Sequence, residues 1–267
     1  MLLIDVHAHL DLEGYEQYGG IDAVLEECVH NGVKAIVANG VNIDSNRKTL
    51  EIAKKHHASN IVKVALGIYP THCLEMISEG KVKEFNDELM FIEENVKTKR
   101  CVAIGEVGLE YKEIKDINDM KKDIQKDCLK KFIHIAKKYN IPIIVHSRNA
   151  ELEVIELLEK EGMKGHKVIM HCFSGRKHLV QRIRDNNWYF SIPCNVDKSL
   201  HFQQIVRDTP VEQLLTETDA PYLSPIPGKT NRPDNVVHTV KKIAELKSMT
   251  QEETANIIYA NYQKLFL

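Results

Sequence analysis

Two histidines near the start of the chain have the spacing of a metal-ligand pair. His7 and His9 stand at the end of the apolar segment 2–7, and residues two apart on a strand point to the same face. Neutral imidazole is a common ligand of zinc, manganese and related ions, so one strand end could present both rings to one metal. An ordinary polar strand end explains an isolated pair more often, and the interpretation therefore depends on partners elsewhere in the chain.

The rest of the chain alternates between short apolar runs and stretches of helical periodicity. The apolar runs predict strands over residues 2–7, 33–38, 61–66, 101–104, 141–145, 167–170, 189–192 and 213–216. Helices are predicted over residues 21–31, 45–56 with Ser45 as its N-cap, 82–96, 116–139, 150–161, 177–186, 198–207, 235–246 and 251–266.

Strands that are apolar throughout and separated by helices indicate a parallel sheet covered on both faces. Eight such units in 267 residues favour an α/β fold with a single (β/α)8 TIM-type barrel, one domain over residues 1–267. The alternative is a doubly wound open sheet, but no glycine-rich phosphate loop follows the first predicted strand.

In such a barrel the active site lies at the carboxyl ends of the strands. Besides His7 and His9, the predicted strand ends carry Glu106, His146, His171 and Asp219. Zinc and manganese sites are built from His and carboxylate ligands, and a carboxylate such as Glu106 has the chemistry to bridge two ions. Each residue alone also fits a structural histidine, a helix N-cap or a salt-bridge partner, but their joint placement predicts a metal site.

Composition indicates a globular protein. Hydrophobic residues make up 43% and charged residues 28% of the chain, no apolar run reaches transmembrane length, and residues 1–5 do not resemble a signal peptide. The six cysteines are scattered without a C-x-x-C pair, which predicts reduced thiols and a cytoplasmic location. The net charge of -2 argues against a protein that coats nucleic acid. It still allows an enzyme that binds a few phosphates through a metal ion and arginines.

Five stretches resemble, in order, the motifs of the TatD family of metal-dependent hydrolases. They are the H-x-H start, GEVGLEY at 105–111, VHSR at 145–148, HCFSG at 171–175 and ETDAPYL at 217–223. The resemblance implies a barrel of the amidohydrolase type with one or two divalent ions and deoxyribonuclease activity. The implied metal ligands are His7, His9, Glu106, His146, His171 and Asp219. Asp219 and Glu106 would also be catalytic, Asp219 by accepting the proton of the attacking water. Zinc or manganese suits this set, and magnesium is an alternative working ion.

Two residues near these ligands are predicted to bind substrate phosphate. Arg148 lies two positions after His146 and shares its face if the strand continues, and a guanidinium fork suits phosphate. Ser174 precedes a predicted helix just after His171, where backbone N–H groups can receive an anion. A pairing of Arg148 with a helix carboxylate and a plain N-cap role for Ser174 are the alternatives.

The chain departs from its relatives at two places. Tyr69 stands where many relatives have a histidine in a Gly-x-His-Pro turn; a phenol donates a hydrogen bond but does not carry a proton as imidazole does near pH 7. His72, close by in the sequence, is a candidate to take the place of that histidine. Arg232 precedes a proline where relatives often carry an acidic or amide residue. We therefore predict substrate contacts for Tyr69, His72 and Arg232, and both departures bear on substrate identity.

The favoured interpretation is a metal-dependent phosphodiester hydrolase, an exonuclease-like deoxyribonuclease whose substrate is single-stranded DNA or DNA strand ends. No membrane and no obligate protein partner is expected. One alternative is a metal-dependent ester or amide hydrolase, such as a TatD-like D-aminoacyl-tRNA deacylase; many amidohydrolases have a lysine where Glu106 stands, which disfavours the amide branch. Another is a catalytically silent nucleic-acid-binding barrel, which would have lost a ligand, whereas all six are present.

Overall fold

Eight parallel strands, paired in sequence order, form the centre of the computed structural model, which describes residues 1–267. The strands are β1 (Leu3–Ala8), β2 (Val33–Asn39), β3 (Val62–Leu66), β4 (Ala103–Glu110), β5 (Ile143–Arg148), β6 (Val168–His171), β7 (Tyr189–Pro193) and β8 (Leu214–Glu217). The backbone N–H of Asp219 donates to the carbonyl of His7 at 2.9 Å, and that of His9 to Ala220 at 2.7 Å. These bonds join β8 to β1 and produce a nearly closed barrel, as predicted, so the open-sheet alternative is wrong.

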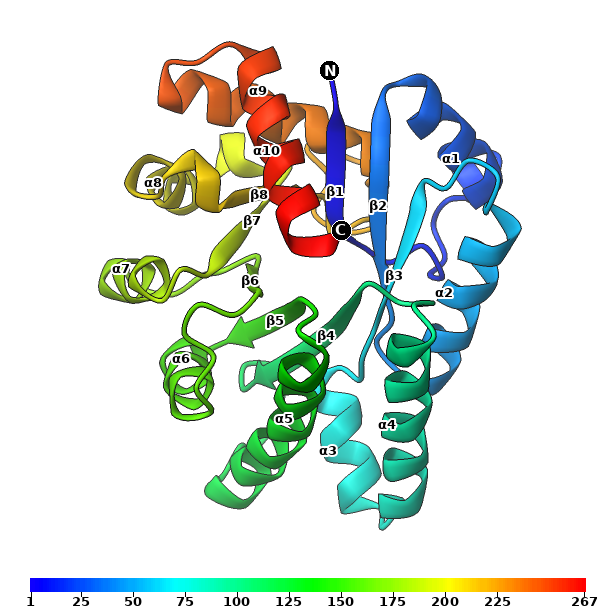
Figure 1. Cartoon of the computed structure of the whole chain (residues 1–267), viewed down its shortest axis with the longest axis vertical. Coiled ribbons are helices and arrows are strands. Elements are labelled where there is room, and N and C mark those ends of the chain that lie inside the picture. The colour runs from blue at the N-terminus through cyan, green and yellow to red at the C-terminus, as the bar shows by residue number, and fades with distance from the viewer.

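Ten α-helices accompany the strands. They are α1 (Ile21–His30), α2 (Ile43–Lys55), α3 (Pro70–Ser78), α4 (Val82–Lys97), α5 (Asp119–Tyr139), α6 (Glu151–Lys160), α7 (Lys177–Asp185), α8 (Leu200–Asp208), α9 (Val236–Lys247) and α10 (Gln251–Phe266). Short 3-10 turns are η1 (Glu16–Tyr18), η2 (Val196–Lys198), η3 (Val211–Gln213) and η4 (Pro233–Asn235). Most of the α-helices surround the strands, whereas α10 lies across the ring that the strands form (Figure 1).

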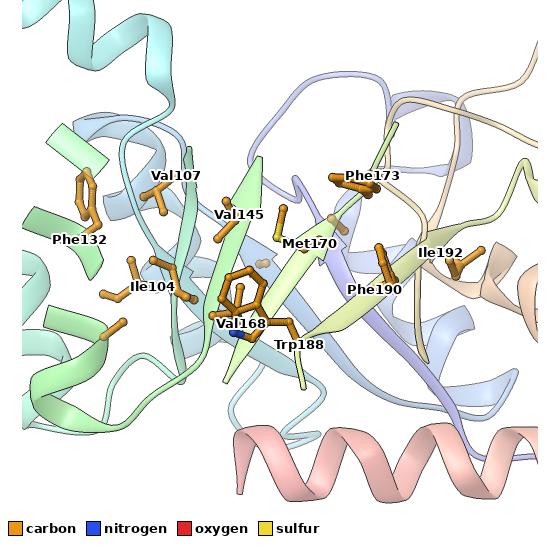
Figure 2. Packing of buried hydrophobic residues seen from close by; sticks show 14 of the residues in the cluster. Ile104, Val107, Phe132, Val145, Val168, Met170, Phe173, Trp188, Phe190 and Ile192 are labelled. Atoms are coloured by element: carbon orange, nitrogen blue, oxygen red, sulfur yellow. The ribbon is translucent and has the colours of Figure 1, made fainter. Parts of the chain in front are cut away.

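The buried apolar residues form two layers, because alternate residues of each strand face opposite sides. The larger layer lies between strands and helices and includes Val145, Met170 and Phe190 of successive strands (Figure 2). The smaller layer takes residues from all eight strands, such as Ile144 and Ile169, and includes Phe266 of α10. This second layer fills the barrel from the end that α10 covers. Polar residues occupy the other end, at the carboxyl ends of the strands.

Three local predictions need correction. The helix α3 was not predicted; Pro70 occupies its first turn, where the absent N–H of proline costs no hydrogen bond. The strand β4 extends to Glu110 rather than ending at 104, since two glycines masked its apolar pattern. Ser45 is not the N-cap of α2: Asn42 caps that helix by accepting a hydrogen bond from the Ser45 backbone N–H at 2.9 Å.

Two strands carry an irregularity in the segment that contains a predicted ligand, His7 in β1 and Glu106 in β4. Between Asp5 and Ala8, three steps along β1 match two along β2, and between Ile104 and Val107, three steps along β4 match two along β5. An extra residue of this kind reverses the alternation of side chains and re-aims those that follow. As a result Glu106 faces the centre of the barrel, although strict alternation would place it on the same side as the outward Ile104.

None of the helices combines the length and the apolar character needed to cross a bilayer. All six cysteines are unpaired, and five of them are buried.

Candidate metal centre

Four of the predicted ligands direct one atom each toward a common point. The Nε2 atoms of His7 and His9 lie 3.3 Å apart, and both lie near the Oε2 atom of Glu106, at 3.4 and 3.5 Å. Asp219 Oδ1 lies 3.7 Å from His7 Nε2 and 3.4 Å from His9 Nε2. We call these four atoms the first donor group.

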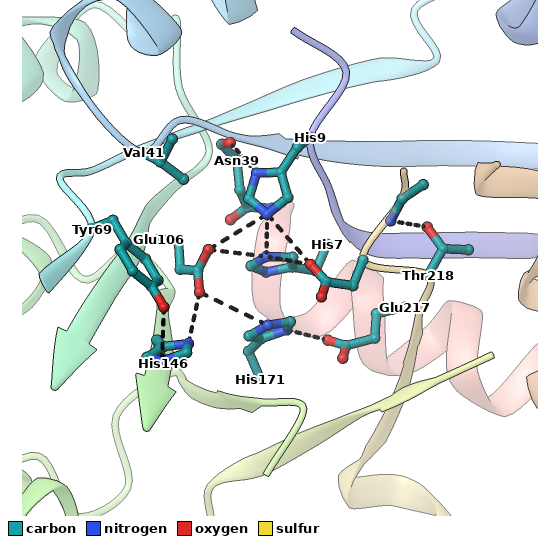
Figure 3. A network of polar contacts seen from close by, with 12 residues as sticks. His7, His9, Asn39, Val41, Tyr69, Glu106, His146, His171, Glu217 and Thr218 are labelled. Atoms are coloured by element: carbon teal, nitrogen blue, oxygen red, sulfur yellow. Dashed lines mark hydrogen bonds and ion pairs between the residues drawn. The ribbon is translucent and has the colours of Figure 1, made fainter. Parts of the chain in front are cut away.

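The other carboxylate oxygen of Glu106 faces two further histidines. Its Oε1 atom lies 3.0 Å from His146 Nδ1 and 3.9 Å from His171 Nε2, and these three atoms form the second donor group. Figure 3 shows the Glu106 carboxylate between the His7 and His9 rings on one side and the His146 and His171 rings on the other. Histidines that β1, β5 and β6 position thus surround the carboxylate of Glu106 from β4, and Asp219, just after β8, approaches the His7 and His9 rings.

The spacing of the first donor group fits a divalent ion. Four ligands arranged tetrahedrally at zinc-ligand distances of about 2.0–2.2 Å lie about 3.3–3.6 Å from one another. The five separations given above, which exclude that between Glu106 and Asp219, run from 3.3 to 3.7 Å, and possible ligand atoms of His7, His9 and Asp219 all lie within 4.8 Å of one another. Two imidazole nitrogens and two carboxylate oxygens are also a donor set that zinc and manganese accept. The residues present therefore fit a metal ion.

Three of the four histidines have their second ring nitrogen fixed by an oxygen atom. His9 Nδ1 lies 3.0 Å from the carbonyl oxygen of Asn39, His146 Nε2 lies 2.9 Å from Glu110, and His171 Nδ1 lies 2.7 Å from Glu217. Such partners set the tautomer and orientation of a metal-binding imidazole. The ring of His7 has no such partner and instead stacks on that of His171, with centroids 3.6 Å apart.

The carboxylates of the centre stay ionised despite their burial. Burial alone would raise the pKa of Glu106, but its electrostatic interaction with His7, hydrogen bonds from His146 and His7 and the charge of His171 together hold that pKa well below its usual range. Burial would also raise the pKa of Asp219, but the hydrogen bond from His9 and the interactions with His171 and His7 together lower it. Both groups are therefore anionic at neutral pH, as metal ligands must be.

The pKa values of the buried imidazoles shift in opposite directions. Burial would lower the pKa of His9, yet the hydrogen bond with Asp219 and the charge of Glu106 raise it to about 9. For His171, the buried carboxylate of Glu217 outweighs burial and raises the pKa to about 10. The pKa of His7 is lowered by burial and by the charge of His171. Without metal, protons on His9 and His171 offset the charge of the carboxylates, and a divalent cation can take over that role.

Asp219 differs from the other predicted ligands in its access to solvent. Its side chain is 17% exposed, while those of His7 and Glu106 are 0% and 5% exposed. Its backbone adopts a left-handed conformation with φ of 57°, which aspartate tolerates better than most residues. This turn ends β8 and places the carboxylate at the open side of the first donor group.

The residues predicted to bind substrate occupy different positions. The Tyr69 hydroxyl lies inside the centre, 3.2 Å from His146 Nε2 and 3.3 Å from Glu110 Oε2. Burial and the charges of Glu106 and Glu110 raise its pKa far above the ordinary range, so the phenol remains neutral. Arg148 lies at the tip of β5, where its half-exposed guanidinium is 3.8 Å from the carboxylate of Glu113.

The other three lie outside the two donor groups. His72 Nδ1 lies 2.9 Å from the carbonyl of Val41, and the hydroxyl of Ser174 donates to Glu151 at 2.8 Å instead of capping α7. Arg232 forms two hydrogen bonds of 2.8 Å with Asp234, pairs with Glu27 of α1 and covers the ring of Tyr18. Nothing in these contacts directs Arg232 toward the metal centre.

Two buried carboxylates were not assigned a role from the sequence. Glu110 and Glu217 are both fully buried and hold His146 and His171. A signal for Glu110 exists in the sequence, since it follows Glu106 by four positions in an extended segment. Glu217 precedes Asp219 by two positions in the same motif and gave no signal of its own.

Comparison with known proteins agrees with this geometry. The family model described as TatD related DNase matches residues 4–267. YabD of Bacillus subtilis (strain 168), named an uncharacterized metal-dependent hydrolase, is 34% identical, with 99% of each chain covered. Human TATDN3, named a deoxyribonuclease, is 31% identical over 99% of this chain and 94% of its own.

A solved structure has a similar fold. A TatD family hydrolase from Entamoeba histolytica superposes with a TM-score of 0.86 at 23% identity, covering 100% of this chain and 98% of its own. The chain belongs to the TatD family of metal-dependent hydrolases.

Proposed function

We propose that this protein is a metal-dependent phosphodiesterase that hydrolyses DNA from strand ends. The observation that carries the proposal is the position of the Glu106 carboxylate, whose two oxygens face two separate donor groups. A carboxylate in this position is suited to bridge two divalent ions, and paired ions are a common device for in-line displacement at phosphorus.

The residues of the metal centre would have different roles in hydrolysis. His7, His9, Asp219 and Glu106 would hold one ion, and Glu106, His146 and His171 the other. When bound, the ions lower the pKa of coordinated water and neutralise the charge that develops on the phosphoryl oxygens. Asp219 is ionised, and its side chain is the most exposed of the four in the first donor group. Its carboxylate therefore accepts the proton of the attacking water.

Arg148 is the best placed of the predicted phosphate contacts. Its guanidinium follows His146 on the same strand, and its only ion pair, to Glu113, is long at 3.8 Å. A side chain held this weakly is free to form two hydrogen bonds with a phosphate. Tyr69 can donate one hydrogen bond near His146. We keep Ser174, His72 and Arg232 as weaker proposals, because each side chain is engaged elsewhere.

Relatives support the choice of substrate. Human TATDN3 is named a deoxyribonuclease, and the mouse protein TATDN3, 30% identical, is named a putative one. We propose zinc or manganese as the tightly bound ion because four of the six predicted ligands are histidines, with magnesium as an alternative. We also propose a cytoplasmic location, from the six unpaired cysteines.

The test is hydrolysis of a single-stranded DNA oligonucleotide by metal-stripped protein supplied with zinc, manganese or magnesium. Asp219→Asn is assayed beside the wild type, with metal content measured for both. Cleavage that requires metal and is abolished in Asp219→Asn supports the proposal. Failure to cleave DNA with any metal, together with hydrolysis of an aminoacyl ester of tRNA, would replace it with ester hydrolysis.

A further inference from the structure

One aromatic side chain of the protein is exposed, and it lies beside the metal centre. The chain has 17 aromatic residues, counted as one Trp, nine Tyr and seven Phe, and of these only Tyr222 falls among the exposed large hydrophobic side chains. Its side chain is 57% exposed. An aromatic ring left in water forgoes the free energy of burial, so its single occurrence next to a reactive site needs a reason.

The ring of Tyr222 contacts a predicted metal ligand. Its centroid lies 6.3 Å from that of His9, with the two planes inclined by 65°. This edge-to-face contact occupies only part of the tyrosine ring, which is consistent with its large exposed area. The hydroxyl group forms no hydrogen bond within the protein, so polar contacts do not explain the position of the side chain either.

The backbone around Tyr222 is firmly held. Its own N–H donates to the carbonyl of Asp219 at 2.8 Å, and the carbonyl of the preceding Pro221 accepts from Asn231 at 3.0 Å. Asn231 is buried and also donates from its side chain to the carbonyl of Thr218 at 2.8 Å. The ring is thus presented on a fixed turn that begins at the proposed proton acceptor, Asp219.

We propose that Tyr222 forms a nucleobase subsite, in which its exposed ring stacks on the base of the nucleotide whose phosphate lies at the metal centre. This inference rests on the proposed function, because a phosphate held between the donor groups places the sugar and base at the mouth where Tyr222 stands. Every base has a π face, so stacking on one tyrosine binds nucleotides without selecting a sequence. The subsite therefore favours nucleotides over phosphate esters that lack an aromatic heterocycle.

Binding to metal-loaded protein tests the subsite without relying on turnover. Calorimetry would compare thymidine 5′-monophosphate with 2-deoxyribose 5-phosphate, which has the same phosphate and sugar but no base. Stacking of one base on an aromatic side chain corresponds to about 5- to 150-fold in affinity. The wild type should prefer the nucleotide by this factor. Tyr222→Ala should lose the preference, and Tyr222→Phe should keep it.

The matched control is Met90→Ala, which removes an exposed apolar side chain, 61% exposed, from α4. It should behave as the wild type, and the metal content of all variants should be equal. Equal affinity of the wild type for the two ligands would overturn the subsite alone, as would a preference that survives in Tyr222→Ala. Failure of both phosphates to bind would contradict the proposed function as well.

Discussion

Replacing Glu217 by glutamine should weaken the binding of metal at the second donor group while leaving the fold intact. Glu217 Oε2 accepts from His171 Nδ1 at 2.7 Å, and the hydroxyl of Ser191 donates to the same oxygen. Both Glu217 and His171 are buried, so water does not screen this interaction. Glutamine has the same shape and still accepts a hydrogen bond from the imidazole, but it removes the negative charge that makes the ring a stronger ligand.

The magnitude follows from the change in hydrogen-bond type. A hydrogen bond to a charged group contributes about 1.5–3 kcal/mol, against about 0.5–1.5 kcal/mol for a neutral one. The difference of about 1–2 kcal/mol corresponds to about a 5- to 30-fold loss of metal affinity. The loss should be confined to the ion that His171 serves, because no contact of Glu217 reaches His9 or Asp219.

Competition with a chromogenic chelator measures the two affinities, and elemental analysis gives the number of ions bound per chain. Glu93→Gln is the control, because this carboxylate also holds a cation and a hydroxyl, Lys138 and Tyr139, but lies on the surface between α4 and α5. Wild-type affinity for both ions in Glu217→Gln would refute the supporting role of the carboxylate. Equal weakening of both ions would show that the two donor groups do not act separately.

Three further outcomes are expected. Arg148→Ala should raise KM for DNA about tenfold with metal content unchanged, and a large loss of bound metal would contradict its assignment to phosphate. Metal affinity at the first donor group should rise about tenfold per pH unit up to about pH 9, because His9 (pKa about 9) must lose a proton, and affinity at the second group should rise up to about pH 10, because His171 (pKa about 10) must lose one; a pH-independent affinity in a buffered titration would contradict this. Trp188→Ala should lower the free energy of unfolding by about 3–5 kcal/mol, since the fully buried indole also donates to the Met163 carbonyl at 2.9 Å; a loss under about 1 kcal/mol in denaturant titrations would be inconsistent with its packing.

The barrel was predictable from the sequence because its signals are local. Apolar runs such as 141–145 and the periodic stretches between them determine the number and order of strands and helices. The ends of the strands and helices were harder to predict. The glycines at 105 and 108 lower the apolar density of β4, and they do so in the segment that carries Glu106.

The grouping of the ligands was predictable only as a consequence of the fold. Once strands are parallel and in order, the residues that follow their carboxyl ends must meet at one mouth. The irregularities in β1 and β4 were not predictable, because one extra residue in a strand depends on pairing with its neighbour. The roles of Glu110 and Glu217 depend on the orientation of imidazole rings from other strands, which no pattern in a single sequence encodes.

We propose that ions bound around Glu106 make the protein a DNA-cleaving enzyme. The most direct measurement is the initial rate of oligonucleotide hydrolysis by metal-stripped protein as manganese or zinc is added in fractions of one equivalent per chain. We expect no cleavage without metal, a rate that levels off at two equivalents, and no cleavage by Asp219→Asn at any metal content. Binding of two equivalents by the wild type without any cleavage of DNA would contradict the claim.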